Sequence, residues 1–175
     1  MTCIAIKKTK NGFEIAADSQ TTWGSHKQPK KNTTDNETRS SGKIFETNGI
    51  TFGCAGDVGN ITMLQYYSKT HIPKSPDKDF IIDWFIEFKE WLNSKAKVGF
   101  NDVGISCIMV MSGNAFVIHD WLSAYQVEDY DAIGSGMFLA LGAFEMGATA
   151  KQAVKVAIKH DLYCGFEVTS RTINQ

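Results

Sequence analysis

The sequence lacks a strong charge of either sign, and it lacks any apolar run long enough to cross a membrane. Its 18 basic and 19 acidic residues give a formal net charge of −1, so no overall field attracts nucleic acid or an anionic membrane. No stretch approaches the roughly 18 continuous apolar residues of a membrane span, and the first residues do not show the charged and apolar segments of a secretory leader. We therefore expect a cytoplasmic protein without nucleic-acid or membrane partners.

Cysteine is scarce and dispersed. The 4 cysteines lie in or near apolar segments without CxxC spacing, which favours reduced thiols over disulfides or a zinc site. The spacings of a phosphate-binding P-loop and of a dinucleotide fingerprint are missing as well. Two glycine-containing segments, Gly53–Asp57 and Gly134–Gly136, stand between a predicted strand and a predicted helix, and alone each indicates an ordinary turn more than an anion site. The sequence predicts neither a cofactor nor a metal.

The order of the predicted elements indicates an α+β fold in one domain spanning 1–175. Apolar residues make up 43% of the chain, enough for a single core. Hairpins are predicted around Asn11-Gly12 and Asn48-Gly49, with a polar, exposed excursion over 20–42 between them. Helices follow at 57–70 and 80–97, strands at 104–129, a glycine-flanked turn that enters a helix over 132–148, a helix at 150–165, and a last strand at 166–173. Strand blocks alternating with helix pairs favour layered sheets covered by helices over a doubly wound parallel sheet.

Three charged residues occupy positions where the pattern expects apolar ones. Asp161 falls on the apolar face of the last predicted helix, Asp18 ends an apolar strand, and Lys43 begins another. A buried charge without a partner is costly, so each needs an opposite charge or a chemical role. From the pattern alone, a structural ion pair or a loop cap is the favoured interpretation of each residue.

Several segments, taken in order, carry a resemblance to a known family. The chain begins Met-Thr and continues with IAADSQTTWG, KIFE, ITFGCAGDVGN, AIGSGMFLALGAFEMG and AVKVAIKHD. In this combination the sequence resembles the proteasome β-subunit and HslV-like threonine peptidases, a family of N-terminal nucleophile (Ntn) hydrolases. The resemblance spans nearly the whole chain. It implies a four-layer αββα sandwich, in which two antiparallel sheets are each covered by a helix pair.

The resemblance gives the second residue a role. In this family the hydroxyl of a threonine that has become the first residue performs catalysis, which would require removal of Met1 and exposure of Thr2. The reference pKa of a free α-amine is about 7.7 to 8.0, so a nearby positive charge leaves the amine able to take the hydroxyl proton. Nucleophile and base would then belong to one residue. The implied reaction is attack on a peptide carbonyl, formation of a threonyl ester, and its hydrolysis.

The resemblance also assigns roles to five further residues. Lys43 matches the active-site lysine, whose charge would lower the pKa of the amine, and Asp18 would orient Lys43. Gly53 matches the glycine whose N–H forms the oxyanion hole. Ser135 and Asp161 match the pair that hydrogen-bonds around the terminal threonine. These assignments replace the structural interpretations that the isolated patterns favour.

Substrate-pocket positions follow from the same resemblance, with some departures from the family pattern. Thr21, Thr51 and Ala55 match residues of the substrate pocket. Cys164 stands where proteasome β-subunits usually have a second serine, and it is a weaker hydrogen-bond partner; Cys3 replaces a second threonine of the HslV start. The excursion before Lys43 is longer than in HslV, so the cleavage preference does not transfer.

The family resemblance further implies assembly and partners. It implies stacked six- or seven-membered rings of identical subunits around a chamber, supplied with polypeptide by an ATP-dependent unfoldase of the HslU type. Two alternatives stay open. The chain would be a non-catalytic ring or scaffold protein if Met1 were retained, and it would be an Ntn amidohydrolase if Thr2 or Cys3 attacked only small amides.

Overall fold

The computed structural model describes residues 2–23, 26–29 and 42–174. Within these residues, two antiparallel sheets form the centre, and a two-stranded ribbon stands beside them. The elements in chain order are β1 (Ile4–Thr9), β2 (Gly12–Asp18), β3 (Gln20–Trp23), β4 (His26–Pro29), β5 (Ile44–Thr47), β6 (Ile50–Gly56), α1 (Val58–Tyr67), α2 (Lys78–Ala96), the short 3-10 helix Phe100–Asp102, β7 (Ile105–Met111), β8 (Asn114–Ile118), β9 (Ala124–Gln126), β10 (Tyr130–Ile133), α3 (Met137–Glu145), α4 (Ala150–His160) and β11 (Val168–Asn174).

The first sheet has the strand order β10-β1-β2-β11. Strands β1 and β2 form the predicted hairpin, with Thr9 opposite Gly12 across the turn. Their buried residues alternate between the two faces, so Ile4 and Ile6 point toward the second sheet, and Ala5 and Ala16 point toward the helices. This alternation follows from the period of two in a strand, and it allows both faces of the sheet to be covered.

The second sheet has the strand order β5-β6-β7-β8-β9. The β5–β6 turn places Asn48 at φ 51° and Gly49 at φ 73°, and the β7–β8 turn places Ser112 at φ 48° and Gly113 at φ 74°. Two successive positive φ values define the tight hairpin turns whose twist matches that of the flanking strands. The turns fix the registers of β5 against β6 and of β7 against β8. The pairing of β6 with β7, which opposes Cys54 and Cys107, joins strands that are separated in the sequence by α1 and α2.

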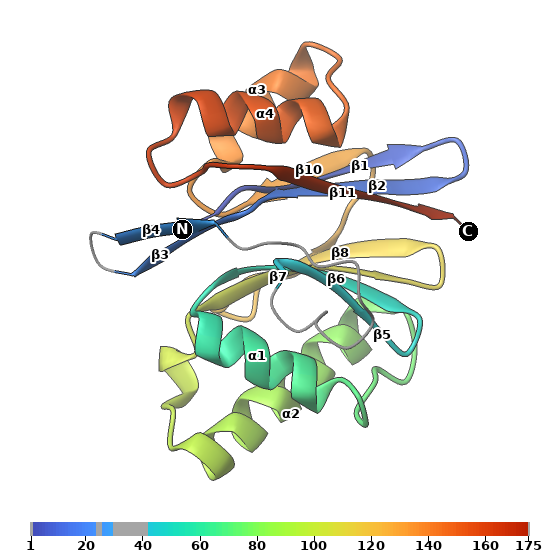
Figure 1. Cartoon of the computed structure of the whole chain (residues 1–175). Coiled ribbons are helices and arrows are strands. Elements are labelled where there is room, and N and C mark those ends of the chain that lie inside the picture. The colour runs from blue at the N-terminus through green and yellow to red at the C-terminus, as the bar shows by residue number, and fades with distance from the viewer. Residues whose placement is uncertain (1, 24–25, 30–41, 175) are drawn as a thin grey trace.

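Helix pairs cover the outer faces of both sheets (Figure 1). Helices α1 and α2 pack on the second sheet through a core that includes Leu64, Trp84 and Phe88, and α3 and α4 pack on the first through small residues such as Ala140 and Ala153. A capping box begins α4, in which Thr149 and Gln152 exchange hydrogen bonds. The apolar face of α2 is buried.

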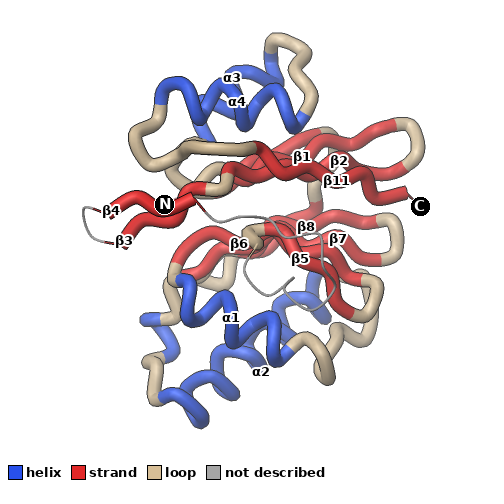
Figure 2. The backbone as a smooth tube through the Cα atoms, viewed as in Figure 1, coloured by secondary structure: helices blue, strands red, loops and turns tan. Residues whose placement is uncertain are grey.

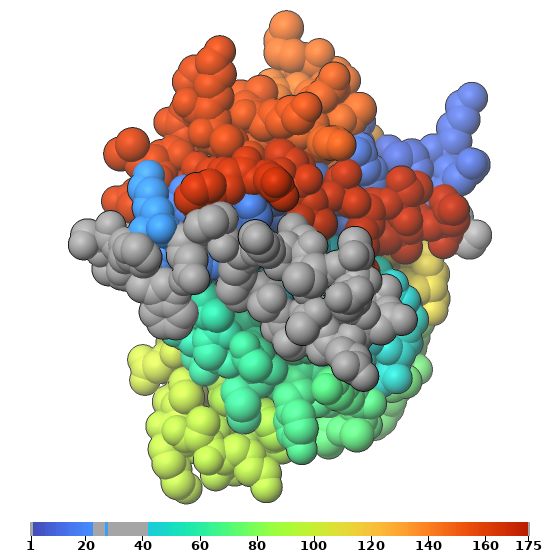
Figure 3. All heavy atoms as spheres, viewed as in Figure 1, coloured from blue at the N-terminus to red at the C-terminus, as the bar shows by residue number. Residues whose placement is uncertain are grey.

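The layers therefore stack as helices, sheet, sheet and helices (Figure 2), which confirms the predicted αββα sandwich. In the space-filling view the two helix layers stand at opposite ends of the molecule (Figure 3). No helix among the described residues is both long and apolar enough to cross a membrane. Of the predicted excursion over 20–42, the described parts include the β3–β4 ribbon; positions 24–25 and 30–41 lie outside the described residues.

The end of α4 differs from the prediction. The helix stops at His160, and Asp161 caps it with an extended backbone at φ −100° and ψ 125°. Asp161 is half-buried instead of lying on a buried helix face, and the next residue, Leu162, is 75% exposed. The periodic pattern of apolar residues in the sequence continues past His160, where the helix ends. The prediction of a buried carboxylate on the helix was therefore wrong.

Candidate active site

Thr2 lies at the N-terminal edge of the first sheet, and its side chain is buried. Its backbone nitrogen donates to Ser135 Oγ at 3.3 Å, and its carbonyl accepts the Gly136 N–H at 3.3 Å. Gly134 approaches so closely that a Cβ there would lie 2.1 Å from the Thr2 carbonyl oxygen, and its φ is +90°. The turn between β10 and α3 therefore needs glycine at this position to hold Thr2.

The Asp18 carboxylate, at the end of β2, joins three segments that are distant in the sequence. Its Oδ1 accepts the Cys3 N–H at 2.9 Å and Lys43 Nζ at 2.6 Å. Its Oδ2 accepts the N–H groups of Gln20 and Gly165, each at 3.1 Å. Charge-assisted bonds of this kind are the stronger hydrogen bonds in proteins, so this buried carboxylate is fully paired.

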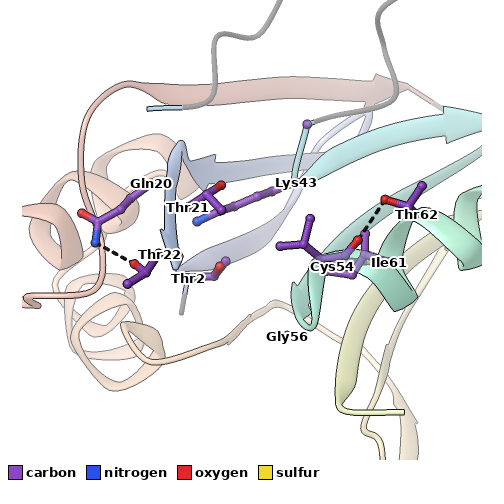
Figure 4. Close-up of a pocket in the computed structure, with 11 residues that line it drawn as sticks. Thr2, Gln20, Thr21, Thr22, Lys43, Cys54, Gly56, Ile61 and Thr62 are labelled. Carbon is purple, nitrogen blue, oxygen red and sulfur yellow. Dashed lines mark hydrogen bonds between the residues drawn. The ribbon is translucent and has the colours of Figure 1, made fainter. Parts of the chain in front are cut away.

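Lys43 lies just before β5 and is the cation of this site. Its side chain extends toward Thr2 and Thr21 (Figure 4), and the side chain is 12% exposed. Burial lowers the pKa of Lys43, while the charge of Asp18 and the hydrogen bond to it act in the opposite direction. Asp18 therefore helps to keep Lys43 protonated in a place where burial alone would favour the neutral amine.

Ser135, Cys164 and Asp161 form a second polar group beside Thr2. Cys164 Sγ donates to Asp161 Oδ2 at 3.4 Å and lies 3.9 Å from Ser135 Oγ. Burial raises the pKa of Cys164 to about 12, so the thiol stays protonated. For Asp161, burial raises the pKa, but hydrogen bonds from the Tyr163 N–H and from the Ser135 and Cys164 side chains outweigh it, so the pKa lies below its usual value.

A cavity of about 60 Å³ opens beside Thr2 and Lys43 (Figure 4). Its wall comes from β3, from the end of β6 and from the first turns of α1, and it consists of Thr2, Gln20, Thr21, Thr22, Gly42, Lys43, Cys54, Gly56, Val58, Ile61 and Thr62. A second cavity, which Ala55, Gly56 and Ser135 line, meets the first at Thr2. Thr2 thus lines both cavities. Among the described residues, no group of three or more His, Cys, Asp or Glu side chains could hold a metal.

Two predicted site residues lie elsewhere. An added Cβ at Gly53 would meet the side chains of Ile4 and Ile15 at 2.8 Å, so Gly53 faces the packing between the sheets. Cys54 donates its N–H to the Lys43 carbonyl on the β5 side, so strand alternation turns the Gly53 N–H toward β7. Thr51 is buried, and neither cavity that Thr2 lines includes it.

Gly56, three residues after Gly53, lines both cavities that contain Thr2. It lies two residues beyond Cys54, so strand alternation turns its N–H toward the β5 edge of β6. Its φ of +127° excludes most side chains, and a Cβ would meet the Gly104 carbonyl oxygen at 2.0 Å. The N-cap Asp57, which ends the strand, is the sequence signal that could have identified Gly56.

The site therefore brings together Thr2, Asp18, Lys43, Ser135 and Asp161, with Thr21 in the first cavity and Ala55 in the second. This set combines a small hydroxyl residue, a cation and a hydrogen-bonded backbone nitrogen. Such groups can perform nucleophilic attack on a carbonyl without a metal or cofactor, because a hydroxyl needs only a base and a donor for the developing oxyanion.

Comparison with known proteins identifies the fold. No protein-family model matches the sequence, and no curated protein matches it. The chain is similar to the structure of Thiobacillus denitrificans BPH in complex with epoxomicin, with a TM-score of 0.84 and 18% identity over 98% of both chains. It is also similar to HslV from Trypanosoma brucei, with a TM-score of 0.75 and 16% identity over 99% of both chains.

A further similar structure is Anbu, the ancestral β-subunit, from Yersinia bercovieri, with a TM-score of 0.68 and 14% identity. That match covers 97% of this chain and 80% of the Anbu chain. Identities this low show a shared fold alone, and the two antiparallel sheets and four helices described above match that fold. The chain therefore has the Ntn-hydrolase fold of the proteasome β-subunit and HslV type, as its sequence predicted.

Proposed function

We propose that this chain is a threonine-type endopeptidase that hydrolyses peptide bonds with Thr2 after removal of Met1. The observation that carries the proposal is the convergence of Thr2, the Lys43–Asp18 ion pair and Ser135 from distant segments. Thr2 and Lys43 line one cavity, and Thr2 and Ser135 line the second. BPH, which shares the fold, is a protein whose structure with epoxomicin is known. Similar folds supply the prior expectation, and the arrangement of these side chains supplies the chemical argument.

The proposed reaction begins at the Thr2 hydroxyl. Its oxygen attacks the substrate carbonyl, and the free α-amine accepts the hydroxyl proton as a general base. The Lys43 ammonium keeps the pKa of that amine low and stabilises negative charge on the threonine oxygen. The backbone nitrogen of Thr2 already contacts Ser135, and the same contact would hold the amine next to the network of Cys164 and Asp161.

The second half of the reaction releases the two products. The protonated amine gives its proton to the departing peptide amine, which leaves a threonyl ester, and a water activated by the same amine then hydrolyses that ester. The Gly56 N–H, directed to the shared edge of the two cavities, is our candidate oxyanion donor in place of Gly53. Acyl and leaving portions of a substrate would occupy the cavities on either side of Thr2.

Intact mass and peptide hydrolysis test this proposal together. The chain expressed with a methionine aminopeptidase should lack Met1 and cleave a panel of fluorogenic peptides. Thr2→Ala is the matched control, because alanine also permits Met1 removal but carries no hydroxyl; it should lower the rate at least about 1,000-fold. Thr2→Ser, which restores a hydroxyl, should retain measurable activity. An epoxomicin adduct on the native chain and none on Thr2→Ala would support the same nucleophile.

Two outcomes would favour the alternative functions. A chain that retains Met1, or that hydrolyses peptides no faster than Thr2→Ala, would favour a non-catalytic ring or scaffold protein. Hydrolysis of small amides without any cleavage of peptides would favour an Ntn amidohydrolase, and a Cys3→Ala variant would then separate the two possible nucleophiles. The sulfur of Cys3 is buried, and burial raises the pKa of that thiol, which supports Thr2 as the nucleophile.

We further propose assembly into rings of identical subunits in the cytoplasm. Phe138 on α3 is 74% exposed, Met146 at its end is 87% exposed, and Val156 on α4 is 37% exposed. Exposed apolar side chains grouped on one pair of helices are typical of an interface. Native mass spectrometry should give a hexamer, a heptamer or a stack of two such rings, and Phe138→Glu with Met146→Glu should dissociate it. Stimulation of protein degradation by an HslU-type ATPase would identify the proposed unfoldase class.

A further inference from the structure

The thiols of Cys54 and Cys107 lie opposite each other on neighbouring strands, and neither has a role in the proposed reaction. Their Sγ atoms are 2.8 Å apart, and the register of β6 and β7 pairs the two residues directly. Both side chains are buried in the core between the second sheet and its helices. Because two paired strands, rather than flexible loops, hold these thiols close together, the thiols are positioned to react with each other.

The backbone geometry at this pair suits a disulfide. Because the Cys54 N–H donates to the Lys43 carbonyl on the β5 side, Cys54 and Cys107 form a non-hydrogen-bonded pair of the β6–β7 ladder. Residues paired in this way have Cα atoms about 4.5 Å apart, within the range of about 4.4 to 6.8 Å that disulfides span. The two sulfurs can therefore bond with side-chain adjustment and little movement of the strands.

The same pair is connected to the site. Cys54 lines the cavity that contains Thr2 and Lys43, two residues before Gly56. The Cys54 N–H also donates to the backbone carbonyl of Lys43, whose side chain is the proposed catalytic cation. A bond between Cys54 and Cys107 would draw the Cys54 side chain, which forms part of the cavity wall, toward β7. A substrate side chain bound in the cavity would then lose contacts with this wall.

We propose that Cys54 and Cys107 are a modification site, where a hydroperoxide converts the two thiols into a reversible disulfide that weakens substrate binding. One thiolate attacks a peroxide oxygen, which breaks the O–O bond and gives a sulfenic acid and, after protonation, water. The second thiol then attacks the sulfenic sulfur and releases a second water. Two electrons and two protons leave the cysteine pair, and hydrogen peroxide is reduced to two waters.

Burial decides which oxidants suit this pair. Cys54 and Cys107 are at most 1% exposed, and burial raises the pKa of Cys54, so the resting Cys54 thiol stays protonated and reacts slowly. Small, uncharged hydrogen peroxide fits this environment better than a bulky disulfide such as oxidised glutathione. Reduction needs an equally small dithiol or a transient opening of the sheet.

The other two cysteines provide an internal control. An added Cβ at Gly136 would lie 2.8 Å from Cys3 Cβ and 2.9 Å from Cys164 Sγ, so Gly136 stands between these residues. They pack under α3 and α4, in a different core cluster from Cys54 and Cys107. A specific reaction at Cys54 and Cys107 should leave Cys3 and Cys164 alkylatable, whereas general oxidation would consume all four thiols.

Peptide mapping of the native chain tests the site without any variant. After exposure to hydrogen peroxide, denaturation and alkylation, we expect a cross-linked pair of peptides containing Cys54 and Cys107, with a mass lower by two hydrogen atoms. Dithiothreitol should restore both thiols. A cross-link between Cys3 and Cys164, or oxidation to sulfinic acids without a cross-link, would overturn the proposal whether or not the chain is a peptidase.

Kinetics test the effect on substrate binding, and this part rests on the proposed peptidase function. Oxidation should raise KM for a peptide substrate by about threefold to tenfold, the effect of a few lost contacts, and dithiothreitol should reverse it. Cys107→Ala, which lies outside the cavity, should resist the change, and Cys107→Ser serves if alanine prevents folding. An unchanged KM in a fully cross-linked sample would refute the coupling, while absence of all hydrolysis would instead count against the proposed function.

Discussion

Replacement of Asp18 by asparagine should destabilise the whole molecule as well as its site. The carboxylate accepts four hydrogen bonds, from the N–H groups of Cys3, Gln20 and Gly165 and from Lys43 Nζ. Asparagine offers one acceptor oxygen, and its NH₂ group would face two donors. In either orientation, Asp18→Asn leaves buried donors without partners and removes the charge that compensates Lys43.

The magnitude follows from the loss of a buried ion-pair partner. Breaking such a pair by changing one member costs about 3 to 5 kcal/mol, because the remaining charge stays buried without compensation. Domains of this size have total stabilities of about 5 to 15 kcal/mol. Asp18→Asn should therefore remove a large fraction of the free energy of unfolding. Lys43 relieves part of the cost by losing its proton, since the charge of Asp18 is what opposes the effect of burial on its pKa.

Urea denaturation followed by tryptophan fluorescence measures this effect. Asp83→Asn is the matched control, because it makes the same chemical change at an exposed position of α2, and it should alter stability by less than about 0.5 kcal/mol. A loss of less than about 1 kcal/mol in Asp18→Asn would refute the reasoning. It would mean that water or a shifted Lys43 compensates the site far better than its burial indicates.

Three further predictions concern the site. Lys43→Met should shift the alkaline-rising limb of the kcat/KM profile to higher pH, because removal of the cation raises the pKa of the Thr2 amine, whereas Lys43→Arg should shift it less; equal profiles would contradict the proposed role. Gly134→Ala should lower stability by about 2 to 5 kcal/mol through backbone strain and the close approach to the Thr2 carbonyl, while Gly142→Ala, with open space around it, should be neutral or stabilising in thermal melts. The pKa of Asp161 in the folded chain lies below the usual 3.8. Its hydrogen bonds therefore add stability that is fully present above pH 3.8 and is lost as the pH falls through the folded pKa. In an acid titration of stability, Asp161→Asn should not show this loss.

The layer architecture could be predicted from the sequence because the local signals for turns, helix caps and apolar faces agree with the overall fold. The Asn48-Gly49 turn, the Thr149 capping box and the apolar face of α2 each specify their element without reference to distant residues. Strand β10 could not be predicted in the same way. It contains only Tyr130–Ile133, and its existence depends on pairing with β1, more than 100 residues earlier.

The site was predicted less completely, because the position of a residue along a strand determines the direction in which its side chain and its N–H point. Gly53 and Gly56 occur in one short segment, and the sequence resemblance selected Gly53. A shift of an odd number of residues reverses both the face and the hydrogen-bonding edge of a strand residue. Only the register of β5 against β6 decides which glycine directs its N–H into the cavities, and that register is a tertiary property.

Asp18 both stabilises the fold and forms part of the candidate site. The Asp18 carboxylate ties the start of β1, the segment after α4 and Lys43 into one buried hydrogen-bonded unit. A charge placed there costs less when several donors share it, so the fold and the cation next to Thr2 stabilise each other. Changes that tune the pKa of Lys43 through Asp18 must therefore also change the stability of the chain. Changes at Ser135, which is exposed, should instead act on the Thr2 amine and on Asp161, which the Ser135 side chain hydrogen-bonds. The difference between these two classes of variant separates the electrostatic role of the site from its structural role.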